Sequence, residues 1–235
     1  MLPLRDTVQS KTSPVVTVGL IIINAVIFIF QLSLGQSLNG FIMTYGFVPS
    51  RFFHFMSKGE IFMGLFPLFT SMFLHGGWLH IIGNMWFLWI FGDNVEDRVG
   101  HFKYFIFYIL CGVAAGLIHG FTNSGSGIPT IGASGAIAGI MGAYFILYPR
   151  AKIWTLIPIF FFVQFVEIPA ILFIGLWILM QFFMGVFSLG AGSLQGGVAW
   201  WAHIGGFAAG AILIFIFRKR KRNLPRKFAD QYYPW

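Results

Sequence analysis

Apolar residues occur in long runs along the chain, separated by short polar segments. A helix needs about 20 apolar residues to cross about 30 Å of hydrocarbon. By this criterion six runs are candidate membrane spans, at about residues 15–34, 75–92, 102–121, 132–148, 168–187 and 199–217. The pattern predicts an all-α polytopic membrane protein folded as a bundle of six transmembrane helices.

Two connections between these runs are themselves apolar. The first, residues 36–71, is rich in phenylalanine with few charges, and we expect it to lie at the membrane interface. The second, residues 153–169, is interrupted by Pro158, Gln164 and Glu167, which favours a partly embedded connection over a seventh crossing. The first run is too long for a signal-peptide core and lacks a cleavage site, so we interpret it as a retained helix.

Composition agrees with a membrane location. Hydrophobic residues make up 57% of the 235 residues and charged residues 9%, whereas a soluble domain has about 25% charged residues. The net charge is +8, but the cations lie at the chain ends and in short loops beside apolar runs, which disfavours nucleic acid as a partner.

The distribution of cations predicts the orientation. If the N-terminus is cytoplasmic, 13 of the 15 lysines and arginines lie on the inside, and only Arg51 and Lys58 lie outside. The positive-inside rule therefore predicts that both termini are cytoplasmic. We expect an N-terminal segment at 1–14, a single membrane domain at 15–217, and a basic tail at 218–235 that stops transfer and attracts anionic lipids.

Ser134 is a hydroxyl inside an apolar run, between Gly132 and Gly135. A serine in a membrane helix commonly bonds back to a carbonyl or joins two helices, and this interpretation stays open. The glycines permit a tight turn, and Gly135, Gly139 and Gly142 form one smooth stripe once the helix begins. A second helix could therefore approach Ser134 closely.

The sixth run carries a similar glycine stripe, because Gly206 and Gly210 follow His203 on the same helix face, three and seven residues later. Two glycine-lined helices can pack near contact distance, which would bring Ser134 toward His203. A serine hydroxyl is a weak nucleophile that an adjacent base activates. The two residues are therefore candidates for a catalytic pair.

His80 and Asn84 are four residues apart in the second run, so they lie one above the other on a helix face. Both can direct N–H donors to a common point, as stabilisation of an oxyanion requires. A buried hydrogen-bonded pair that joins helices is the alternative. We interpret His75, at the start of this run, as an interfacial or packing residue.

The six histidines raise the question of a metal site. Cys111 is the single cysteine, so neither an internal disulfide nor a cysteine-based metal site can form. No carboxylate is spaced near His75 or His80 as a zinc-protease helix requires. We expect no metal site.

Three motifs occur in order on the second, fourth and sixth predicted helices: FTSMFLHGGWLHIIGNMWFLWIFGDNVED, GASG followed by GIMG, and AHIGGFAAG. In these motifs, and from about Phe66 to Gly210, the chain resembles the rhomboid intramembrane serine proteases. The resemblance implies that Ser134 is the nucleophile and His203 its general base. It also implies an oxyanion hole formed by His80, Asn84 and the backbone N–H of Ser134. No acidic residue in these helices is placed to orient His203, which favours a Ser–His dyad.

The resemblance also implies an activity and a location. We expect a serine endopeptidase of the plasma (inner) membrane that cuts peptide bonds in or next to transmembrane segments. Its expected partners are transmembrane protein substrates and the lipid bilayer, and the oligomeric state is open. The glycine-rich loop at 188–198 is expected to cap the site, and the fifth helix to form a lateral substrate gate.

Two positions depart from the family's pattern. Some members carry an aromatic residue one turn after the nucleophile that packs on the histidine, but this chain has Ala138 there, which leaves open what orients His203. A Trp–Arg pair of the first loop is not evident, although Arg51 could serve a similar interfacial purpose.

Two other function classes remain as alternatives. A non-catalytic rhomboid-like protein would hold membrane clients, but such relatives typically lack the serine or the histidine, and this chain has both. A transporter or channel is disfavoured because membrane acids are scarce and no repeat is visible.

Overall fold

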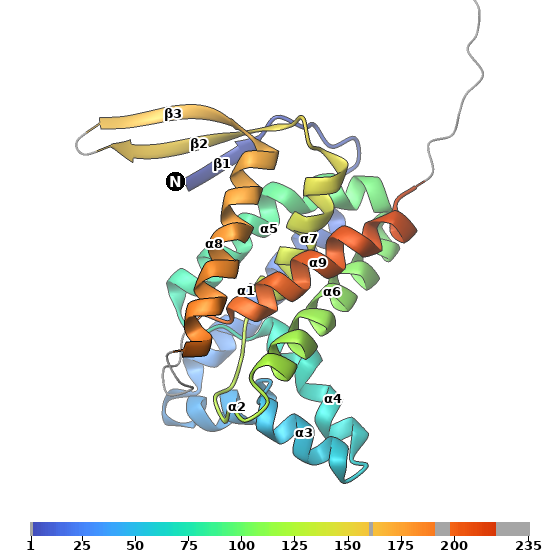
Figure 1. Cartoon of the computed structure of the whole chain (residues 1–235), viewed down its shortest axis with the longest axis vertical. Helices are drawn as coiled ribbons and strands as arrows, with labels where there is room; N and C mark the ends of the chain where they lie inside the picture. The colour runs from blue at the N-terminus through green and yellow to red at the C-terminus, as the bar shows by residue number, and fades with distance from the viewer. Residues whose placement is uncertain (1, 160–161, 191–197, 220–235) are drawn as a thin grey trace, which may run out of the picture.

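The computed structural model describes residues 2–159, 162–190 and 198–219, which form a helical bundle with a small sheet at one end (Figure 1). The helices that correspond to the six predicted runs are α1 (Val15–Ser33), α5 (Trp78–Val99), α6 (His101–Thr122), α7 (Ser134–Leu147), α8 (Ala170–Gly190) and α9 (Trp200–Phe217). The predicted polytopic helical fold is therefore confirmed. The second helix continues past the predicted end of the run at residue 92, to Val99.

The helices differ in how far they can span. Within the described residues, α1, α6, α8 and α9 are each long and apolar enough to cross a membrane, and α5 would be a fifth span together with the segment that precedes it at an 84° bend. Helix α7 has 14 residues, and is therefore only about 21 Å long. It is shorter than the hydrocarbon thickness because its first residue lies inside the bundle.

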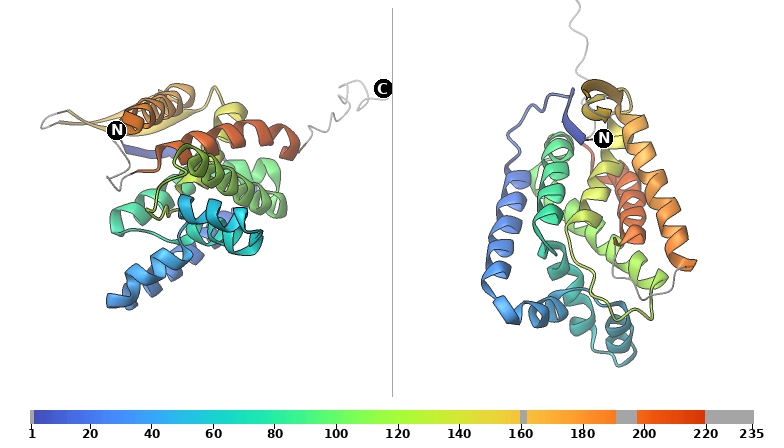
Figure 2. Two further views of the ribbon diagram at one scale, coloured as in Figure 1. Left: turned by 60° about the horizontal axis from the view of Figure 1, so that its bottom comes forward. Right: turned by 90° about the vertical axis from the view of Figure 1, so that its left-hand side faces the viewer.

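Helix α7 is the centre of the molecule. Every residue from Gly135 to Tyr144 is buried, against α9, α6 and α5. Helices α1 and α8 lie on opposite sides of the bundle (Figure 2). The irregular segment that leads into α7 is held by protein groups, since the Gly132 N–H donates to the Ser71 carbonyl at 2.9 Å. Irregular backbone at membrane depth requires such partners because lipid provides none.

The connection at 36–71 forms short helices at the end of the bundle away from the sheet (Figure 1). These are α2 (Leu38–Tyr45), α3 (Pro49–Ser57) and α4 (Ile61–Thr70), which leads through a short 3₁₀ turn toward α5. The Arg51 guanidinium on α3 donates to the carbonyls of Met43, Thr44 and Gly46. Arg51 thus caps the C-terminal end of α2, where carbonyls lack helical partners.

The sheet was not expected from the sequence. Strands β1 (Leu2–Asp6), β2 (Lys152–Ile159) and β3 (Phe162–Pro169) form an antiparallel sheet in the order β1-β2-β3. The segment interpreted as a partly embedded connection is therefore a β-hairpin, and the predicted N-terminal segment supplies the third strand. The β-branched and aromatic residues of the hairpin favour strands. Its pairing with β1, however, joins positions about 150 residues apart, which local patterns do not reveal.

Asp6 fastens the sheet to the bundle. Its carboxylate accepts hydrogen bonds from the Tyr144 hydroxyl on α7 at 2.5 Å and from the Asn94 amide on α5 at 2.8 Å. Burial raises the pKa of Asp6 to about 6.

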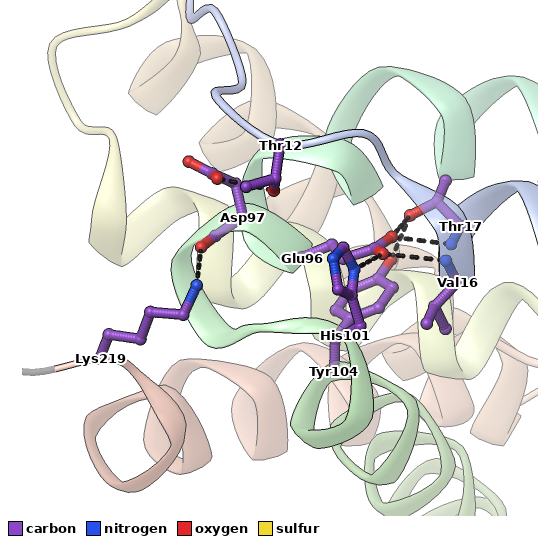
Figure 3. A network of polar contacts seen from close by, with 8 residues as sticks. All are labelled: Thr12, Val16, Thr17, Glu96, Asp97, His101, Tyr104 and Lys219. Atoms are coloured by element: carbon purple, nitrogen blue, oxygen red, sulfur yellow. Dashed lines mark hydrogen bonds and ion pairs between the residues drawn. The ribbon is translucent and has the colours of Figure 1, made fainter.

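A second polar network joins the helix ends near the sheet (Figure 3). The fully buried Glu96 carboxylate accepts hydrogen bonds from the backbone N–H groups of Val16 and Thr17, and contacts His101 Nδ1 at 2.6 Å. It therefore caps the first turn of α1, which the helix itself leaves without acceptors.

The chain segments flanking the bundle meet at Asp97. The Thr12 hydroxyl donates to the Asp97 carboxylate at 2.8 Å, and Lys219 Nζ donates to the Asp97 carbonyl at 2.9 Å (Figure 3). The residues just before α1 and just after α9 therefore lie at the same end of the bundle, where the sheet also lies.

Candidate active site

Ser134 is the first residue of α7 and half-buried. The predicted helix at 132–148 would have included Gly132, but Gly132 has φ +123° and belongs to the loop before the helix. This left-handed conformation suits glycine alone. The loop therefore ends in a tight turn that places Ser134, with its first-turn backbone N–H, at the start of a helix inside the bundle.

His203 lies one turn into α9 and is buried. Its Nε2 atom is 2.8 Å from Ser134 Oγ, although the two residues are 69 positions apart in the chain. This distance is that of a hydrogen bond between a hydroxyl donor and a nitrogen acceptor.

The close approach of α7 and α9 is made possible by glycines. A Cβ atom at Gly206 would overlap the backbone carbonyl of Gly135, and one at Gly210 would overlap that of Gly139. A Cβ at Gly142 would likewise overlap the carbonyl of Phe207. The two backbones are thus in direct contact along about two turns of α7, beginning beside Ser134.

His80 and Asn84 on α5 converge on the same loop. A Cβ at Gly132 would lie 2.6 Å from His80 Nε2 and 3.5 Å from Asn84 Nδ2. The Gly76 N–H lies 3.3 Å from His80 Nδ1, which favours the tautomer that carries its hydrogen on Nε2. Asn84 Nδ2 is buried, and no acceptor among the described residues bonds to it. Both donors are therefore directed toward the backbone that precedes Ser134.

Gln181 is a site residue that sequence reasoning missed. It lies on α8, is 2% exposed, and its Oε1 atom is 2.7 Å from His203 Nδ1. The rings of Trp177 and Trp200 also approach the imidazole, with centroids at 5.8 and 6.4 Å. A signal was present, because Gln181 is the one strongly polar residue in the predicted run at 168–187 and polar groups in membrane helices need a reason.

The site therefore combines groups from four helices of a membrane bundle, in a geometry that invites comparison with known proteins. The family model described as "Rhomboid domain" matches residues 63–220, which include all of these groups. The chain belongs to the rhomboid family.

Curated relatives agree with this assignment. RHOMBOID-like protein 1 of Arabidopsis thaliana is 31% identical over 169 residues, which cover 69% of this chain and 39% of the relative. Rhomboid-like protein 11, chloroplastic, of the same plant is 27% identical over 67% of this chain and 54% of its own length. Rhomboid protein 1, mitochondrial, of Saccharomyces cerevisiae is 27% identical over 60% of this chain and 39% of its own length. The rhomboid chain thus spans about two fifths to one half of these relatives.

His75 stands beside the site of this rhomboid protein. Its side chain is buried, in agreement with a packing residue, and its ring is 5.1 Å from that of His80. The side chain of Gln31 on α1 holds the His75 backbone, accepting from its N–H at 3.0 Å and donating to its carbonyl at 3.1 Å. His75 therefore connects α1 with the start of α5.

A cavity of about 30 Å³ adjoins Ser134, lined in part by Ser71, Gly132 and Ala199. A cavity of this size accommodates a water molecule. Cys111 is buried in α6, and the described part of the rhomboid chain contains no group of three histidine, cysteine or carboxylate side chains that could hold a metal ion. Residues 191–197 of the predicted capping loop and residues 220–235 of the basic tail lie outside the described residues.

Proposed function

We propose that this rhomboid protein is a serine endopeptidase that hydrolyses peptide bonds in or next to transmembrane segments of membrane proteins. The observation that carries the proposal is the 2.8 Å contact between His203 Nε2 and Ser134 Oγ. A hydroxyl that donates to a buried imidazole is the arrangement by which serine hydrolases form a nucleophile.

In the first step, Ser134 Oγ attacks the scissile carbonyl carbon while its proton passes to His203 Nε2. The tetrahedral intermediate then collapses, the C–N bond breaks, and His203 gives the proton to the leaving amine. In the second step His203 takes a proton from a water molecule, which attacks the acyl ester. The ester C–O bond then breaks, and His203 returns the proton to Ser134 Oγ. Water is the only co-reactant, and no cofactor enters the reaction.

The negative oxygen of each tetrahedral intermediate needs donors. We assign this role to His80 Nε2–H, Asn84 Nδ2–H and the backbone N–H of Ser134. The unpartnered state of Asn84 Nδ2 supports the assignment, because a buried donor without an acceptor is costly unless it acts on a ligand. Donors fixed in a low-dielectric site stabilise developing charge without reorganisation.

Gln181 would act as a positioning residue for His203. Its carbonyl oxygen accepts from Nδ1–H, which leaves Nε2 free of a proton and able to accept from Ser134. A neutral amide thus takes the place that a carboxylate has in a Ser–His–Asp triad. Gln181 and Trp177 on α8 supply the orientation that Ala138 on α7 does not.

Gln181→Leu should lower kcat about tenfold with little change in KM, since it removes one hydrogen bond to the base and leaves the substrate contacts in place. Gln181→Glu, which keeps an acceptor oxygen, should retain more activity than the leucine variant. The measurement is the cleavage rate of a single-pass model substrate in proteoliposomes, with Met180→Leu on the exposed side of α8 as the matched control. Equal rates for Gln181→Leu and Met180→Leu would contradict this role.

The substrate class follows from the position of the site. Ser134 and His203 lie within the bundle, near the ends of α7 and α9 away from the sheet, so a substrate must present unwound backbone there because a helix keeps its carbonyls in hydrogen bonds. The positive charges at the opposite end support a cytoplasmic location for both termini. The chain is a multi-pass membrane protein, and we propose the plasma (inner) membrane as its location.

A fluorophosphonate probe tests the nucleophile directly in detergent. The parent should be labelled, while Ser134→Ala and His203→Ala should not. Ser188→Ala is the matched control, because Ser188 also lies on a membrane helix but donates to the Gly185 carbonyl at 2.6 Å. Labelling that survives in Ser134→Ala, or a folded parent that neither reacts nor cleaves, would overturn the proposal and favour a client-binding role.

A further inference from the structure

The β2–β3 hairpin separates apolar from charged residues along its length. Among the described residues of the hairpin, the large exposed apolar side chains lie in the segment 162–166 of β3, at Phe162 (73% exposed), Val163 (57%), Phe165 (59%) and Val166 (38%). They belong to both faces of the strand, because successive side chains alternate. Gln164 is the polar exception in this segment.

The charges of the hairpin lie at its base, next to the bundle. Lys152 and Glu167 form an ion pair at 2.8 Å, and the Trp154 indole N–H donates to Glu167 at 2.9 Å. The Arg5 guanidinium of β1 stacks over the Trp154 ring, 5.0 Å from its centroid. The hydrogen bonds from Lys152 and Trp154 and the charge of Lys152 hold the pKa of Glu167 below its usual value. The Glu167 carboxylate at the base of the hairpin therefore remains ionised.

The sheet at this end of the bundle packs against the side of α5 through β1. Along β1, the Pro3 carbonyl accepts from Trp86 Nε1 at 2.6 Å, and Asp6 accepts from Asn94, so the strand follows α5 over eight residues, or about 12 Å. Trp86 falls inside the apolar run predicted to cross the membrane, at 75–92. Strand β1 thus contacts part of the run that is predicted to cross the membrane.

The pairing of the strands connects β1 with the exposed segment of β3. Leu2 pairs with Leu156, and Leu156 pairs with Phe165, so Phe165 lies across the sheet from the start of the strand that contacts α5. Figure 1 shows the hairpin pointing sideways from the bundle, across the end of α8. Helix α8 follows β3 directly, and its first turn already exposes Ile171 (41%) and Leu172 (56%).

We propose that segment 162–166 of β3 inserts its apolar side chains into the lipid leaflet beside α8, while Lys152, Glu167 and Arg5 stay at the headgroup level. We choose lipid as the partner because the apolar surface of the hairpin is continuous with that of the first turn of α8. Lipid covers such exposed apolar side chains on a membrane helix. Exposed apolar side chains with aromatic and cationic residues at their polar border are typical of interfacial segments.

The backbone limits the depth of insertion. Strand β3 is an edge of the sheet, so alternate N–H and C=O groups along it have no strand partner. Such groups are expensive to place in hydrocarbon. The hairpin therefore lies in the interfacial layer with its side chains directed into the acyl chains. This inference is independent of the proposed protease activity.

Cysteine labelling in proteoliposomes tests this proposal. In a Cys111→Ala background, Val163→Cys and Phe165→Cys are each labelled with an environment-sensitive fluorophore, and Gln9→Cys, an exposed position after β1, is the matched control. We expect blue-shifted emission at positions 163 and 165, with at least twofold stronger quenching by brominated lipid than at position 9, and weaker quenching by iodide.

Two results would overturn the proposal. One is iodide quenching at 163 and 165 equal to that at position 9, which would place the hairpin in water. The other is protection from both quenchers, which would indicate that protein covers the hairpin. Unchanged fluorophosphonate labelling of parent and cysteine variants, or unchanged unfolding midpoints if the parent is unreactive, would show that each variant is folded.

Discussion

Ser134→Ala is expected to lower cleavage of a transmembrane substrate to the uncatalysed background. This variant lacks the hydroxyl that donates a hydrogen bond to His203, so no acyl intermediate can form. Removal of the nucleophile or the base from a soluble serine protease lowers kcat about 10⁶-fold. His203→Ala should have the same effect, because a neutral serine without its base is a poor nucleophile.

The double variant distinguishes a catalytic pair from two separate roles. If Ser134 and His203 act as one catalytic unit, Ser134→Ala combined with His203→Ala should be no slower than either single variant. The kcat of Asn84→Ala should lie between that of the parent and that of these variants, lowered about 10²- to 10³-fold, since the substitution removes one oxyanion donor of several.

The assay is the initial cleavage rate in proteoliposomes of a single-pass protein with alanine near the outer end of its transmembrane helix. Ser188→Ala, which keeps the catalytic groups, should cleave at the parental rate. Measurable cleavage by folded His203→Ala at a rate close to that of the parent would contradict the assignment of the base.

Gly210→Ala is expected to lower the free energy of unfolding by about 3 kcal/mol, at the upper end of the effect of overpacking. The new methyl group would overlap the backbone carbonyl of Gly139, and backbone can yield only if α7 and α9 move apart. Gly206→Ala should additionally reduce activity, because its methyl group would overlap the Gly135 carbonyl next to Ser134.

Gly19→Ala provides a matched control for these glycines. Gly19 also lies in a membrane helix, but a Cβ there meets nothing within 4 Å. Alanine has the higher helix propensity, so this variant should be as stable as the parent or slightly more stable. The readout is the unfolding midpoint in detergent micelles. Equal midpoints for Gly210→Ala and Gly19→Ala would show that α7 and α9 are not in backbone contact.

The sequence predicted much of the candidate site but not Gln181, the residue that contacts His203 Nδ1. His80, Asn84, Ser134 and His203 were found because polar groups and glycines are conspicuous inside apolar runs. Gln181 carried the same signal, but its relation to His203 depends on how α8 packs against α9. The buried Glu96 is similar, because only the packing of α1 against α5 shows that this acid caps a helix.

The amino-acid sequence by itself determined the membrane class, the approximate helix positions and the family. Span length, charge bias and motif order are local properties that can be read along the chain. Only the tertiary structure decided the contact between His203 and Ser134, the tautomer favoured by Gln181, and the sheet that joins residues 2–6 to residues 152–169. These features depend on which surfaces meet, and distant surfaces are brought together by packing of the whole bundle rather than by local periodicity.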